Sequence, residues 1–131
     1  MMDDQQAEEL YKRFTTLQGE ATELKEHFER LQEQLQNIAR TREALKTLQQ
    51  LEGSTEAWIS IAPGAYVPGK VDKPQTVLLN IGADIAVEKR PEEVERTLVE
   101  HELQLEQLSE HTLTRLREAL DKLEAIREEV K

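Results

Sequence analysis

The chain has 131 residues and a formal net charge of −10, and 34% of its residues are charged. Apolar residues make up 37% and aromatic residues 4%, too little for a thick globular core. The sequence contains no cysteine, which excludes disulfides, thiolate metal sites and a cysteine nucleophile. The acidic start is unlike a signal peptide, and no apolar run approaches a membrane span. Because the negative charge also disfavours nucleic acid and membrane surfaces as partners, we expect a small cytoplasmic protein.

Residues 1–52 are expected to form one long helix with a coiled-coil seam, the stripe of side chains that packs against a partner helix. The apolar residues follow one another at an average step of 3.5, a repeat typical of coiled coils. They are Leu10, Phe14, Leu17, Ala21, Leu24, Phe28, Leu31, Leu35 and Ile38. Asp3 or Asp4 is expected to cap the start of this helix, and Gly53 to follow its end.

Residues 53–90 are rich in β-branched residues and turn formers, which predicts two β-hairpins. The expected strands are 57–61, 66–71, 76–81 and 84–89. Alternation places one apolar set on the inward faces: Ile59, Ile61, Val67, Val71, Val77, Leu79, Ile81, Ile85 and Val87. It places a polar set on the outward faces: Ser60, Lys70, Asn80 and Glu88. Since small sheets with open edges are marginal alone, we expect several chains to close these strands into an inter-subunit β-barrel.

Residues 91–131 are expected to form a second long helix that begins at Pro91 and is followed by acidic residues. Its apolar stripe averages 3.6 residues, which predicts little supercoiling. The stripe consists of Val94, Leu98, His101, Leu105, Leu108, Thr112, Leu116, Leu120, Leu123, Arg127 and Val130. Folding the chain back pairs residues whose numbers sum to about 142. The expected fold class is therefore α+β: a long antiparallel coiled-coil hairpin with two central β-hairpins.

Both chain ends lie at one end of the expected helical hairpin, which we call the tip. The apolar residues expected there are Leu10, Tyr11, Phe14, Leu123, Ile126 and Val130. Packing within the seam explains Phe14 at least as well as a binding role does. Capture of exposed apolar segments of other proteins is a competing interpretation for four of them, because a two-helix structure cannot cover its own tip: Leu10, Tyr11, Ile126 and Val130.

The sequence shows no active site. Residues 64–70 match the phosphate-loop pattern G-x-x-x-x-G-K, but Val71 follows where serine or threonine is needed, and a strand follows where a helix is needed. His27, His101 and His111 have no metal-ligand spacing. General acid–base chemistry needs two groups whose surroundings differ, and the carboxylates on the exposed helix faces share similar surroundings. We therefore expect no catalytic residue, metal or cofactor.

Three strings in the middle segment resemble the hairpin signatures of a known family: Ala65–Val71, Val77–Ala83 and Val87–Lys89. With the two flanking helices, they make the chain similar to the α-class subunits of prefoldin, including eukaryotic prefoldin subunit 5. The chain departs from that pattern at Arg90, where a capping threonine is common, and at Pro63, which interrupts the first hairpin.

The resemblance implies an ATP-independent chaperone in which hairpins of two α and four β subunits form a double barrel carrying six helical tentacles. In that family the tips hold non-native client proteins and pass them to a group II chaperonin. The inward strand residues would then be the assembly site, and the tip residues would be the client contacts. The alternative function is a self-assembling coiled-coil scaffold or filament subunit that binds no client.

Overall fold

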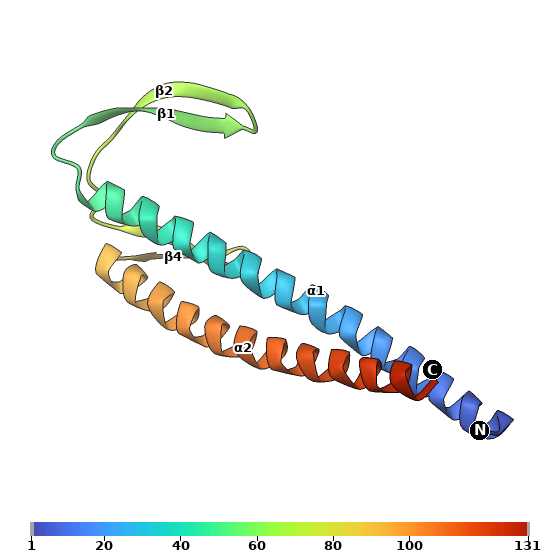
Figure 1. The fold of residues 1–131 in the computed structure, drawn as a ribbon. Coiled ribbons are helices and arrows are strands. Elements are labelled where there is room, and N and C mark those ends of the chain that lie inside the picture. Colours follow the sequence, from blue (N-terminus) through green and yellow to red (C-terminus); the bar gives the residue numbers. More distant parts are fainter. Residues whose placement is uncertain (1, 131) are drawn as a thin grey trace. The chain divides into compact units, whose positions relative to one another are not determined.

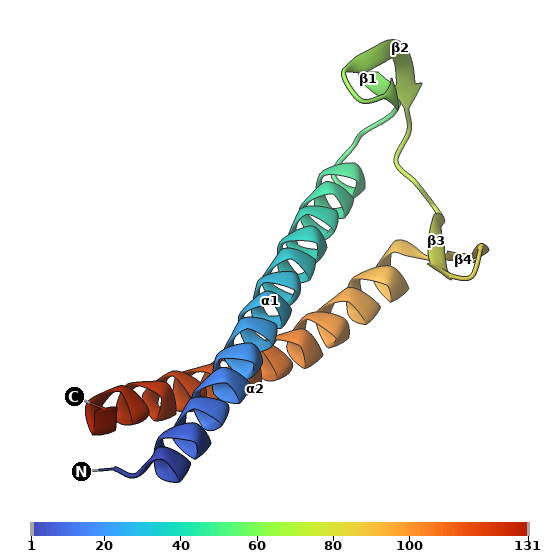
Figure 2. The ribbon, with the colours of Figure 1, turned by 90° about the vertical axis from the view of Figure 1, so that its right-hand side faces the viewer.

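The computed structural model describes residues 2–130, apart from the side chain of Ile81. Six elements follow one another along the chain (Figures 1 and 2): α1 (Asp4–Gln49), β1 (Thr55–Ala62), β2 (Ala65–Val71), β3 (Val77–Gly82), β4 (Ile85–Lys89) and α2 (Pro91–Val130). The chain divides into two units, which are described separately. One unit combines the described parts of 1–36 and 103–131, and the other consists of residues 37–102.

The two helices run antiparallel, as expected. In the first unit the beginning of α1 lies beside the end of α2, so the two helices run in opposite directions there (Figures 1 and 2). In the second unit the last turns of α1 and the first turns of α2 belong together with both hairpins. The expected fold of two long helices with two central β-hairpins is confirmed.

Asp3 caps the start of α1. Its Oδ1 accepts a hydrogen bond from the backbone N of Gln6 at 2.7 Å, and the Gln6 side chain accepts one from the backbone N of Asp3 at 3.2 Å. This reciprocal pair satisfies two N–H groups that a helix start otherwise leaves free. The other end of α1 differs from the prediction, because the helix stops at Gln49 and the chain turns into β1 through Gly53, whose φ is +72°.

The seam of α1 is where the sequence predicts it. All nine expected seam residues of α1 are buried or half-buried. They fall into two columns of seven-residue spacing, which continue to the helix end. One column contains Leu10, Leu17, Leu24, Leu31, Ile38 and Leu45, and the other contains Phe14, Ala21, Phe28, Leu35, Arg42 and Gln49.

The seam of α2 differs from the predicted stripe. One column of inward positions contains Pro91, Leu98, Leu105, Thr112, Ala119 and Ile126, and the other contains Glu95, Glu102, Ser109, Leu116 and Leu123. Both columns repeat every seven residues, so the predicted 3.6-residue drift is wrong. Five residues predicted on the stripe are instead exposed: His101, Leu108, Leu120, Arg127 and Val130. Small or polar residues take their place because packing follows position along the helix rather than the size of the apolar side chain.

The strands form two separate antiparallel sheets, β1 with β2 and β3 with β4. In each sheet the pairing shifts by one residue near the turn, at Ile61 and at Ile81. The turn between β3 and β4 places Ala83 and Asp84 at φ angles of 51° and 60°. Two consecutive left-handed residues are typical of the tight turn whose twist matches a hairpin.

Arg90 and Glu93 form the start of α2, where the chain has no capping threonine. The carbonyl oxygen of Arg90 accepts hydrogen bonds from the backbone N of Glu93 and of Val94, at 3.0 and 3.1 Å. The Arg90 guanidinium donates to Glu93 at 3.2 Å. A carboxylate within the first turn also suits the positive end of the helix dipole. Glu93 therefore contributes at a helix start where the Arg90 side chain offers no acceptor.

Candidate functional site

The first hairpin carries an apolar face that its own chain leaves open. The register pairs Ile59 with Val67, and Val71 lies on the same face two pairs away. Ile59 and Val67 are exposed and Val71 is half-buried. Gly69 lies on this face too, and a side chain there would collide with the side chain of Ile59. Glycine at this position therefore lets Ile59 lie flat across β2.

The second hairpin has a similar face. Val77, Leu79 and Val87 share one side of the sheet and are half-buried, while Ile85 continues the same side of β4 and is exposed. The strand pairing does not place two of the predicted inward residues, Ile61 and Ile81, on either side of their sheets. Ile61 is the extra residue of the shifted pairing in β1, so alternation no longer fixes its side. The side chain of Ile81 lies outside the described part of the structure.

The opposite faces of the hairpins hold large apolar side chains that the sequence analysis did not select. Trp58 is 73% exposed and lies directly opposite Pro68. Tyr66 and Leu78 are also on these faces, and Leu78 is 68% exposed. The same alternation that selects the inward set places these residues with Ser60, Lys70, Asn80 and Glu88, so the signal was present in the sequence. Each hairpin is therefore apolar on more than one side.

The tip residues differ from one another in exposure. Tyr11 and Val130 are 71% and 62% exposed, whereas Leu10, Phe14 and Leu123 are half-buried. Ile126 is only 4% exposed, because it occupies an inward column of α2. Of the six predicted contacts, Tyr11 and Val130 are thus the ones that offer most of their surface, and Ile126 is covered.

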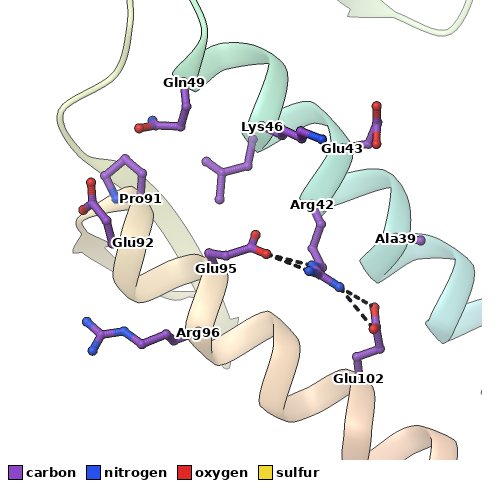
Figure 3. A pocket seen from close by; sticks show the side chains of 11 residues that line it. Ala39, Arg42, Glu43, Lys46, Gln49, Pro91, Glu92, Glu95, Arg96 and Glu102 are labelled. Atoms are coloured by element: carbon purple, nitrogen blue, oxygen red, sulfur yellow. Dashed lines mark hydrogen bonds and ion pairs between the residues drawn. The ribbon is translucent and has the colours of Figure 1, made fainter.

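Arg42 forms a polar clamp between the helices of the second unit (Figure 3). Its Nη2 lies 2.8 Å from Oε1 of Glu95, and its Nη1 lies 3.1 and 3.2 Å from the two carboxylate oxygens of Glu102. The hydrogen bond to Glu95, and then that to Glu102, raises the pKa of Arg42 above its ordinary value. The guanidinium therefore stays charged and bridges two acids that are seven residues apart on α2.

The clamp lines a groove of about 670 Å³. Leu45 and Pro91 line it together with Gln49, whose side-chain Nε2 is buried and has no hydrogen-bond partner. Charged groups surround the rest of the groove, as Figure 3 shows for Glu92 and Arg96. The groove contains no cluster that would support a nucleophile or a metal.

Over the described residues, the phosphate-loop match and the histidines are not arranged as a reaction centre. Residues 64–70 lie in the turn before β2 and in β2 itself, and the next element is the strand β3 rather than a helix. Within residues 2–130, no three histidine or acidic side chains are grouped to hold a metal ion. Neither helix, over the residues described, is apolar enough to cross a membrane. The candidate functional surfaces are therefore the hairpin faces and the tip.

Comparison with known proteins identifies similar chains. A family model described as prefoldin subunit matches residues 17–131. The prefoldin subunit alpha of Methanococcus maripaludis is 31% identical over 86 residues, which cover 63% of this chain and 58% of that protein. The prefoldin subunit alpha of Thermofilum pendens is 25% identical over 127 residues, which cover 97% and 98% of the two chains. The match to the Methanococcus protein therefore spans less than two thirds of that relative.

A similar fold is found among solved structures. The cryo-electron microscopy structure of filamentous PFD from Methanocaldococcus jannaschii aligns with a TM-score of 0.76. The alignment covers 91% of this chain and 98% of the other, with 19% sequence identity. At this identity the likeness concerns the fold alone.

Proposed function

The chain belongs to the prefoldin family as an α-class subunit, and from this premise we propose that it is an ATP-independent holdase that binds non-native proteins at its tip. Prefoldin subunits are non-enzymatic chaperones, and membership of the α class implies assembly with β-class subunits. We propose two α and four β subunits, a cytosolic location, and transfer of the client to a group II chaperonin.

The open apolar faces of the hairpins support the assembly. Ile59, Val67 and Ile85 are exposed in the single chain, and both sheets have two strands only. Two-stranded sheets with an open apolar face are marginal in water, and pairing with strands of other subunits removes both the free edges and the exposed surface. The hairpins are therefore the assembly site in this proposal.

Exposed apolar groups at the tip carry the client-binding part of the proposal. Tyr11 and Val130 lie on the exposed faces of the helix ends, among charged residues, where apolar side chains stay in contact with water. A single tip offers a small contact and hence weak affinity. Several tips that contact one unfolded chain bind it with useful avidity without ATP, and such binding keeps the chain from aggregating.

An aggregation assay tests the tip. Tyr11→Ser combined with Val130→Ser is expected to abolish the suppression of aggregation of a chemically denatured client, with the assembled complex unchanged in mass. Leu103→Ser is the matched control, since Leu103 is a similarly exposed apolar residue of α2 about 40 Å along the helix from Val130. If the double variant suppresses aggregation as well as the control does, the tip is not the client site.

Native mass spectrometry tests the hairpins. Val67→Asp places a charge on the apolar face and is expected to prevent assembly with a β subunit, because a buried unpaired charge is strongly unfavourable. Ser60→Asp adds the same charge to the opposite face of the same hairpin and is expected to leave the complex intact. Equal masses for the two variants would contradict the assignment of the inward face.

A filament subunit is the second candidate, because the fold is shared with a filamentous PFD. Native mass spectrometry of this chain, alone and with a β subunit, separates the two functions. A discrete complex with two α and four β subunits favours the chaperone, whereas long homopolymers favour the scaffold.

A further inference from the structure

The seam changes its chemistry toward the hairpins in one of its two columns. On α1 this column contains apolar residues as far as Leu35, and then Arg42 and Gln49. On α2 one column is apolar at Leu123 and Leu116, and polar at Ser109, Glu102 and Glu95. The other column of each helix has no charged residue over the same stretch. In each helix, charged and other polar side chains are thus concentrated in one column, toward the end that leads to the hairpins.

The apolar part of the seam cannot by itself fix how the helices are aligned along their axes. Its residues repeat every seven positions, so a shift of α2 by seven residues again places apolar side chains opposite apolar side chains. Leu116, for example, would take the place of Leu123. A heptad repeat therefore permits several registers of similar packing.

The polar contacts do distinguish these registers. In the first unit the Gln32 side chain donates to the Ser109 hydroxyl at 2.7 Å, so the paired residue numbers sum to 141. In the second unit Arg42 lies between Glu95 and Glu102. The residue numbers of these two pairs sum to 137 and 144, which lie on either side of 141. Within each unit, the polar contact therefore corresponds to a pairing in which the residue numbers sum to about 141.

We propose that Arg42 specifies the register of the two helices by requiring carboxylates at two successive positions of the α2 column. A shift of seven residues in one direction would place Arg42 between Glu102 and Ser109, so that one acid is lost. A shift in the other direction would place it between Glu95 and Glu88, and Glu88 lies in β4 before α2 begins. Only the observed register provides two acids on α2.

The register matters because the hairpins are attached at this end. The first hairpin follows α1 after Gln49, and the second leads directly into α2 at Pro91. A slip of one heptad would displace these two attachment points relative to each other by about 10 Å along the helix axis, since each residue adds 1.5 Å. Strands that must meet other subunits would then start from the wrong places.

The register that Arg42 selects and the stability that it contributes are separate properties. An ion pair between helices loses hydration when it forms, and its replacement by apolar residues is often neutral or stabilising. A polar residue in a coiled-coil seam, in contrast, selects one alignment over others. Arg42→Leu is therefore expected to leave the thermal midpoint unchanged or higher, while the alignment becomes heterogeneous.

Double electron–electron resonance measures the alignment directly. The chain has no cysteine, so Gln18→Cys with Gln107→Cys gives two unique spin-label sites, both exposed and both in the first unit. In the observed register the sites are offset by about 24 Å along the axis, and a slip of one heptad changes this offset by about 10 Å. One narrow distance peak is expected for the parent chain, and Arg42→Leu should add a second peak.

Three further variants complete the test. Leu35→Met, an apolar change in the same column, should keep the single peak. Glu95→Gln with Glu102→Gln, which retains Arg42, should reproduce the second peak. Arg42→Glu with Glu95→Arg and Glu102→Arg should restore the single peak, because the pairing is reversed rather than removed. A single unshifted peak for Arg42→Leu in a folded, helical chain overturns the proposal, as does a second peak that the reversed pairing fails to remove.

Discussion

The buried amide of Gln49 predicts that removing a hydrogen-bonding group will stabilise this protein. Its Nε2 lies beneath the surface of the groove and has no acceptor. A buried donor without a partner costs about 1–3 kcal/mol relative to its hydrated state. Methionine has a similar length and flexibility but no polar donor, so it fills the same space beside Leu45 and Pro91. Taking the lower end of the range, Gln49→Met should gain about 1 kcal/mol.

A gain of this size is measurable on the isolated chain. It corresponds to a rise of about 4 °C in the thermal midpoint for a protein of this length, and to about 0.5 M in the urea midpoint. Circular dichroism at 222 nm follows both transitions. Gln50→Met is the matched control, because the neighbouring Gln50 is exposed and its change should have no effect. If Gln49→Met lowers either midpoint, the amide makes a favourable interaction and the reasoning fails.

Three further predictions concern the turn, the first hairpin and the clamp. Ala83→Asn should stabilise the second hairpin by about 1 kcal/mol, because asparagine tolerates the left-handed conformation better than alanine; weaker amide-exchange protection of β3 and β4 would contradict this. Gly69→Val should displace Ile59 and change the fluorescence of Trp58, the sole tryptophan; an unchanged spectrum together with unchanged assembly would show that the face tolerates a side chain. Arg42 has a raised pKa, so its ion pairs are present below the ordinary arginine value and are lost only above the raised one. The urea midpoint of Arg42→Leu relative to that of the parent, whether unchanged or higher, should therefore be the same at pH 7 and pH 10, and a relative midpoint that changes between these pH values would refute this.

The two helices differ in how well their seams can be predicted from sequence. On α1 the inward positions hold large apolar residues such as Phe14 and Leu31, so the apolar pattern and the packing pattern coincide. On α2 they hold Ser109 and Ala119, while Leu120 faces outward. A prediction that assigns the largest apolar side chains to the seam therefore selects the wrong face of α2. A strict seven-residue repeat matched to that of α1 would have found the right one.

The hairpins and the tip show a similar limit. Alternation predicts the shared face of Ile59 and Val67, but it cannot anticipate the extra residue at Ile61, since a β-bulge leaves little trace in composition. At the tip, sequence position alone did not separate the exposed Tyr11 from the covered Ile126. In the sequence, Arg42 is only a charged residue at an apolar seam position. Its two partners could not be predicted, because they lie more than 50 residues away along the chain.

The start of α1 and the end of α2 lie together at the tip, and this affects how the protein can be handled. An affinity tag fused directly before α1 or directly after α2 would lie close to Tyr11 and Val130, the side chains proposed to receive clients. A flexible peptide tethered there would compete with a client or mimic one, and an untagged preparation would then behave differently in the aggregation assay. Purification by charge, or removal of the tag before measurement, avoids an artefact that follows from the antiparallel arrangement itself.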